Sequence, residues 1–239
     1  MAVVDDLGYH ASQALAQLAS VDLERWLEVW TRRLKPARDA ETEAGGYRAV
    51  PWDDHRFDAL AAAEPVARRA TLVRLLALAG TLGSSGAEQL GTLFWRTAVP
   101  GVDDVADEPP EVDPVRVTEA LGVYAAWALD AETGPHLAEA LLHGFPWQLV
   151  LDAPAWGQQL LETASGERRA TIMDGLGRAA HGVVYGEARL RRVLEAADAR
   201  CGELDAGTVA HRFYADLAAT TRNELERWAS EGEQRGPWR

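Results

Sequence analysis

Apolar residues recur along the chain at intervals of three and four positions, which is the spacing that places them on one face of an α-helix. Polar and turn-forming residues separate these stretches at helix lengths. No alternating strand pattern recurs together with hairpin signals. The pattern therefore predicts an all-α fold, a compact bundle of about eight to ten helices. One such stripe consists of Leu72, Leu75, Leu76 and Ala79.

Proline and glycine mark the expected helix boundaries. Pro65 stands at the first position of a helix that contains the leucine stripe, and Gly83 lies near the end of that helix. Asp113 and Pro114 begin a second helix, and Pro135 begins a short third one. Residues 167–200 are expected to form one long helix or two stacked helices, and residues 208–230 are expected to form the last helix.

Residues 99–114 interrupt the helical pattern near the middle of the chain. This stretch holds six acidic residues, four prolines and no basic residue. Prolines break helices, and a segment with so few apolar side chains buries little surface. We expect one all-α domain over residues 1–239, in which 99–114 forms a flexible acidic linker between two helical halves.

Composition excludes several classes of partner. The chain is 47% hydrophobic and 26% charged, as in ordinary globular proteins, and its net charge is −13. No clustered basic face is evident, which argues against nucleic acid and anionic membrane surfaces. No apolar run is long enough to span a membrane, the N-terminus lacks a signal pattern, and Cys201 is the only cysteine. We therefore expect a cytoplasmic protein.

The segment 135–143, PHLAEALLH, is the first candidate site. At about 100° per residue, His136, Glu139 and His143 lie close together on a helix and could share a metal ion. Leu137 and Leu141 point in another direction, so the alternative is a solvated helix flank. Metal sites in helical bundles need further ligands from a facing helix. Asp174 and His181 are the best candidates for that role.

A polar stripe in the expected helix at 167–200 is the second candidate. Its members recur at i, i+4, i+7 and i+11 and are candidate catalytic residues: Asp174, Arg178, His181 and Tyr185. Gly175, Gly182 and Gly186 run beside the stripe. Glycine is costly inside a helix, so these glycines indicate close approach of another backbone or of a ligand. The alternative is plain helix packing beside an ordinary i, i+4 ion pair between Asp174 and Arg178.

The sequence identifies no cofactor-binding residues and leaves the cofactor unknown. Gly175, Gly177 and Ala180 match the dinucleotide-binding fingerprint, but that fingerprint needs a preceding strand, which the sequence does not supply. The chain has no P-loop, HExxH, GxSxG or CxxC motif.

Tryptophan is used nine times, far more than is ordinary. Six of these residues stand among apolar neighbours and are expected in the core: Trp26, Trp30, Trp95, Trp127, Trp147 and Trp156. Trp228 and Trp238 stand in a polar C-terminal region, where exposure is expected.

Three functional hypotheses follow, and they leave open whether the chain is an enzyme. The first is a cytoplasmic accessory or interaction protein that binds a protein partner. The second is a bundle with an internal pocket that binds or transforms a small apolar molecule, using the tryptophans and the stripe from Asp174 to Tyr185. The third is a metal-dependent bundle enzyme with His136, Glu139 and His143 as ligands. None of these hypotheses fixes an oligomeric state.

Overall fold

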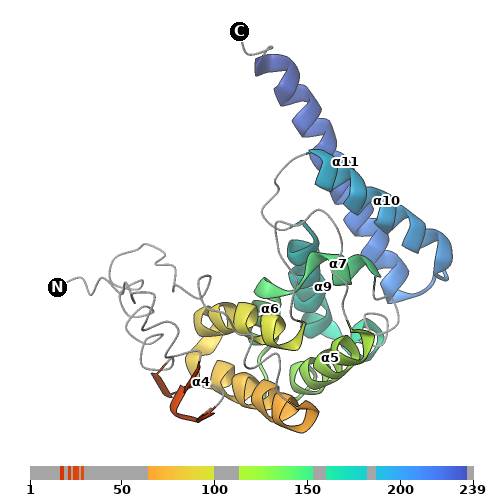
Figure 1. The fold of residues 1–239 in the computed structure, drawn as a ribbon. Coiled ribbons are helices and arrows are strands. Elements are labelled where there is room, and N and C mark those ends of the chain that lie inside the picture. The colour runs from red at the N-terminus through yellow and green to blue at the C-terminus, as the bar shows by residue number, and fades with distance from the viewer. Residues whose placement is uncertain are drawn as a thin grey trace.

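The structure is a computed structural model, and it describes residues 17–18, 21–22, 24–26, 28–29, 64–99, 113–152, 160–181 and 187–235. Every regular element in these ranges is helical, and no strand occurs among them (Figure 1). The predicted all-α multi-helix fold is therefore confirmed.

The long helix α4 (Pro65–Ala98) is two helical segments joined at a kink. Pro65 occupies the first turn, where its missing N–H is not needed. At Gly83 the backbone has φ 76° and ψ −173°, a conformation that glycine adopts without a Cβ clash. The predicted helix end at Gly83 is therefore a kink at which a second segment begins. The predicted leucine stripe is buried: Leu72, Leu75, Leu76 and Ala79.

Four short elements follow α4: α5 (Pro114–Ala128), α6 (Pro135–Ala140), the 3-10 helix η1 (Leu141–Gly144) and α7 (Trp147–Asp152). The Asp113 side chain caps α5 by accepting a hydrogen bond from the Val115 backbone N–H at 2.9 Å. The expected starts at Pro114 and Pro135 are thus confirmed. Capping residues and prolines fix these boundaries locally, so the sequence alone predicts them.

Glycine permits α4 and η1 to pack at backbone contact. A Cβ atom on Gly144 would lie 2.4 Å from the Thr92 Cα, and one on Gly91 would lie 2.6 Å from the Leu141 carbonyl oxygen. Trp95 secures the same contact, because its indole N–H donates to the Leu141 carbonyl at 2.9 Å. These contacts fix the position of the segment that carries the first candidate site.

The C-terminal part contains α9 (Gly166–His181), α10 (Glu187–Glu203) and α11 (Val209–Arg235). The expected helical stretch at 167–200 is thus described as two helices, with 182–186 outside the described residues. Helices α10 and α11 pack along each other as a hairpin. Figure 1 shows the last turns of α11 extending past the start of α10, away from the other helices.

Two residues of the hairpin bond to the backbone of α7. Tyr214 of α11 donates its hydroxyl to the Val150 carbonyl at 2.6 Å, and Arg200 of α10 donates its Nε–H to the Leu151 carbonyl at 2.9 Å. The hairpin therefore packs against α7, and α9 also packs against α7.

Most of the predicted acidic linker, residues 100–112, lies outside the described residues. Val99 before it is buried, and Asp113 and Pro114 after it open α5. No helix in the described ranges is both long and apolar enough to cross a membrane.

Burial of the tryptophans follows the expectation where they are described. Trp26, Trp95 and Trp147 are buried, Trp127 is half-buried, and Trp228 is 43% exposed. Four others lie outside the described residues: Trp30, Trp52, Trp156 and Trp238.

Candidate functional site

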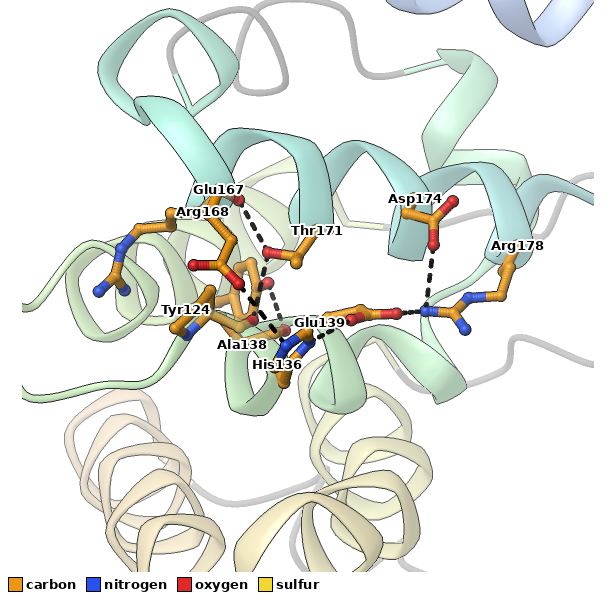
Figure 2. A network of polar contacts seen from close by, with 10 residues as sticks. Tyr124, His136, Ala138, Glu139, Glu167, Arg168, Thr171, Asp174 and Arg178 are labelled. Carbon is orange, nitrogen blue, oxygen red and sulfur yellow. Dashed lines mark hydrogen bonds and ion pairs between the residues drawn. The ribbon is translucent and has the colours of Figure 1, made fainter.

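The first candidate segment lies against α9 (Figure 2). His136 and Glu139 are one turn apart on α6, with 3.4 Å between the His136 Nδ1 and the Glu139 Oε2. The other ring nitrogen, Nε2, lies 3.7 Å from the Glu167 Oε1 of α9. The imidazole is therefore placed between two carboxylates, one from each helix.

Arg178 joins the two candidate sets. Its guanidinium pairs with Glu139 of α6 and lies 3.7 Å from the Asp174 Oδ2, one turn earlier on α9. Glu139 is only 15% exposed, whereas Arg178 and Asp174 are mostly exposed. From the sequence, Asp174 and His181 are expected to face the short segment. The α9 side chains that contact it are Glu167, Thr171 and Arg178. Arg178 is a cation at a position where an additional metal ligand was sought.

Among the described residues, this segment is not part of a complete set of metal ligands. His143 is exposed in η1, and the described residues contain no group of three or more His, Cys, Asp or Glu side chains placed to hold one. Arg178 already supplies the positive charge beside Glu139. Carboxylates coordinate metals through the same oxygens that accept from a guanidinium, so the pair and a metal compete. The observed arrangement is an ion-pair network that fastens α6 to α9.

His181 belongs to a different contact. Its Nε2 lies 2.8 Å from the Thr221 Oγ1 of α11, and the Thr221 hydroxyl in turn lies 2.7 Å from the Leu217 carbonyl. A hydroxyl has one proton, so with that proton donated to Leu217 the Thr221 oxygen accepts from the His181 Nε2–H. Burial holds the pKa of His181 below its usual value; Glu224 opposes the shift and Arg189 reinforces it. A neutral, half-buried imidazole thus joins α9 to α11.

The predicted polar stripe is therefore divided. Asp174 and Arg178 lie at the contact with α6, His181 lies at the contact with α11, and Tyr185 is outside the described residues. No described contact brings these residues together around one reacting group. His136 and Glu139 lie together on α6, as their spacing predicts. Arg178 comes from α9, which is distant in sequence, so its pairing with Glu139 could not be read from spacing alone.

The close approach expected at the glycines is confirmed at Gly175. A Cβ atom there would lie 2.9 Å from the Leu142 Cδ1 and 3.3 Å from the Glu139 carbonyl oxygen. The neighbour at Gly175 is thus the α6–η1 segment of the protein itself. Gly182 and Gly186 lie outside the described residues.

Two polar side chains on α7 were not anticipated as a site. Trp147 and Gln148 are both buried, and among the described residues neither the indole Nε1 nor either amide atom of Gln148 has a hydrogen-bond partner. The guanidinium of Arg189, from α10, lies over the Trp147 ring at 4.7 Å from its centroid. A lone glutamine within the apolar run 145–151 is the signal in the sequence that could have identified it.

The apolar face of α11 changes from buried to exposed along the helix. Leu217, Ala218 and Thr221 are buried, Leu225 is half-buried, and Trp228 is 43% exposed. The exposure expected for Trp228 is confirmed. An exposed indole at the end of a buried stripe is the most prominent apolar feature on the described surface of this hairpin.

No relative offers a function that could be carried over to this chain. Comparison of the chain with protein-family models, with curated proteins and with solved structures found no match.

Proposed function

We propose that this chain is a helical accessory protein that binds a partner protein through the distal part of α11. The observation that carries the proposal is the continuation of the buried α11 stripe into Leu225 and the exposed Trp228. The proposal names no reaction. The described contacts of five of the candidate catalytic and metal residues join helices or turns of one helix: His136, Glu139, Asp174, Arg178 and His181.

The distal stripe has the same direction as the buried one. At about 100° per residue, Leu225 and Trp228 lie within roughly 60° of Thr221 around the helix axis. Asn223 and Arg227 lie on the opposite side and are exposed. The distal segment is therefore amphipathic, and its apolar face is partly exposed at Trp228 among the residues that the structure describes.

The difference in length between α11 and α10 accounts for the exposure of this face. Helix α11 has 27 residues and its hairpin partner α10 has 17. At the helical rise per residue, about 15 Å of α11 has no counterpart in α10. Figure 1 shows this projecting end.

A projecting amphipathic helix end fits an apolar groove on another protein. Helix-in-groove recognition reads apolar anchors at i, i+3, i+4 and i+7, and Leu225 and Trp228 stand at i and i+3. Tryptophan is among the residues that contribute most to binding when a partner covers them. The net charge of −13 favours a protein partner over nucleic acid, and the lone Cys201 favours a cytoplasmic location.

A pair of charge substitutions on opposite faces of α11 tests the proposal. Leu225→Glu places a charge on the apolar face, whereas Asn223→Glu places the same charge on the polar face. In the native cell, Leu225→Glu should lower the amount of co-purified partner by about tenfold or more, relative to the unsubstituted chain. Asn223→Glu should leave that amount unchanged. Equal recovery of the same proteins with both variants would contradict the proposal.

The oligomeric state is the necessary companion measurement. Light scattering on the purified chain should give a monomer for both variants. If the unsubstituted chain forms a dimer and Leu225→Glu dissociates it, then the partner that α11 binds is a second copy of this chain.

A further inference from the structure

The first segment of α4, before the kink at Gly83, has apolar residues on its exposed side as well as on its buried side. The buried side carries the leucine stripe described above. On the opposite side, five exposed residues lie within about 40° of one direction at the helical repeat: Val66, Ala70, Val73, Ala77 and Gly80. We call these five residues the α4 row. A surface helix normally carries polar or charged residues on its solvent side, so an uncharged exposed row is unusual.

The exposure of the α4 row is continuous. Val66 is 84% exposed and Val73 is 52% exposed, and the three small residues of the row are exposed as well. A Cβ atom at Gly80 would meet nothing within 4 Å among the described residues. At the helical rise per residue, the row extends for about 20 Å. Single exposed valines are ordinary, whereas a continuous apolar strip is typical of a surface that another molecule covers.

Other sides of the same segment are occupied by the chain itself. The buried Arg68 donates to Glu119 of α5 at 2.8 Å, and Arg74 pairs with Glu24 of the N-terminal region at 2.8 Å. At about 100° per residue, Arg68 lies about 160° from Val66 around the helix axis, and Arg74 lies about 80° from it. Both contacts are therefore made on sides of the helix other than the α4 row.

The charges beside the α4 row indicate what kind of partner fits it. Residues 65–87 contain three arginines and no acidic residue, in a chain whose net charge is −13. Two of these arginines, Arg68 and Arg74, pair with carboxylates of the chain. The third, Arg69, is exposed at one edge of the row, and the part of the chain that the structure describes holds no ion-pair partner for it. A carboxylate from outside the chain would complement this edge.

We infer that the α4 row is a docking surface for an acidic amphipathic helix of a partner protein. The inference concerns α4 and is independent of the partner surface on α11. Leucines of the partner helix would lie over Val66 and Val73, and the small residues between the valines permit the two helix axes to approach to about 8–10 Å. A glutamate beside those leucines would reach Arg69. The α4 row of a second copy offers no such carboxylate, because residues 65–87 have none.

Two helical peptides test the inference on the full chain by fluorescence anisotropy. Each peptide has about 20 residues, which matches the length of the row with a turn to spare at each end. Leucines repeat at i, i+3, i+4 and i+7, and the positions beside them are all glutamate in one peptide and all lysine in the other. The glutamate peptide should bind saturably and at least about threefold more tightly than the lysine peptide. Equal affinities, tighter binding of the lysine peptide, or no saturable binding of the glutamate peptide would overturn the inference.

Three variants locate the binding of the glutamate peptide. Val73→Glu places a charge in the middle of the α4 row and should weaken binding by about tenfold or more. Arg69→Glu reverses the charge at the edge and should reverse the order of the two peptides. Leu225→Glu makes the same kind of change on α11 and should leave the affinity unchanged.

The results that would contradict this assignment follow from the same variants. Unchanged binding of the glutamate peptide by Val73→Glu, or its loss in Leu225→Glu, would overturn the inference. Circular dichroism checks that each variant is folded. If Val73→Glu does not fold, Ala77→Glu takes its place with the same expected loss, and unchanged binding by that variant would overturn the inference instead.

Discussion

Arg178 of α9 pairs with Glu139 of α6 across the contact between the two segments that the sequence analysis singles out. The pair joins a partly buried carboxylate to a guanidinium that is 63% exposed. The pair positions α6 against α9, and the metal-ligating role of His136, Glu139 and His143 stays a prediction. The network around it is shown in Figure 2.

Removal of the Glu139 charge should have a modest effect on stability. The Glu139→Gln variant should lose about 0.5–1 kcal/mol of unfolding free energy, because exposed Arg178 can be solvated when its partner is neutral. Urea unfolding measures the change. Asp174→Asn is the matched control, and it should cost less than about 0.3 kcal/mol because Asp174 is exposed and its oxygen is 3.7 Å from Arg178. Equal losses in the two variants would contradict the assigned role of Glu139.

Because Arg178 pairs with Glu139, we expect the folded protein to be stable without a metal ion at this site. His143→Ala should leave the unfolding free energy within about 0.5 kcal/mol of the parent, as for other exposed positions. Elemental analysis of protein purified without chelators should find no near-stoichiometric zinc, iron or manganese. Near-stoichiometric metal that His143→Ala removes would restore the metal hypothesis for His136, Glu139 and His143.

Two glycines of α9 should respond to alanine in opposite directions. At Gly175 a Cβ atom would lie 2.9 Å from the buried Leu142 side chain, and crowding there should outweigh the gain in helix propensity, for a net loss of about 1–2 kcal/mol. At Gly177 a Cβ atom meets nothing within 4 Å. Gly177→Ala should therefore stabilise the protein by up to about 1 kcal/mol. Thermal unfolding of both variants checks the pair, and a stabilising Gly175→Ala would refute the close approach.

Acid should weaken the contact between α9 and α11. The pKa of His181 is lowered in the folded protein, so below about pH 6.5 the unfolded chain binds a proton that the folded chain excludes. Stability then falls with pH until the lowered pKa is reached. Urea unfolding between about pH 7.5 and pH 5.5 should show this slope in the parent and a shallower slope in His181→Gln. That variant retains an amide able to bond Thr221, and an unchanged slope would assign the pH dependence to other groups.

Local chemistry explains which elements the sequence predicts well. Proline at first helical positions and the Asp113 cap depend on neighbouring residues only, and each is placed as expected. At Gly83 a helix end is expected, and the structure has a kink that joins two helical segments. The pairing of Arg178 with Glu139 depends on how α6 and α9 pack, and spacing within either segment does not contain that information. The periodicity that placed His181 beside Arg178 on one face held, but a second neighbouring helix, α11, contacts His181.

Site-specific photo-crosslinking in the native cell tests the central claim most directly. A photo-reactive amino acid is placed at position 228, on the apolar face of α11, or at position 223, on the opposite face. Crosslinks from position 228 should capture one reproducible protein partner, which position 223 does not capture and which Leu225→Glu abolishes. Capture of the same proteins from both positions, or of no protein from position 228, would contradict the role of α11 as a docking helix.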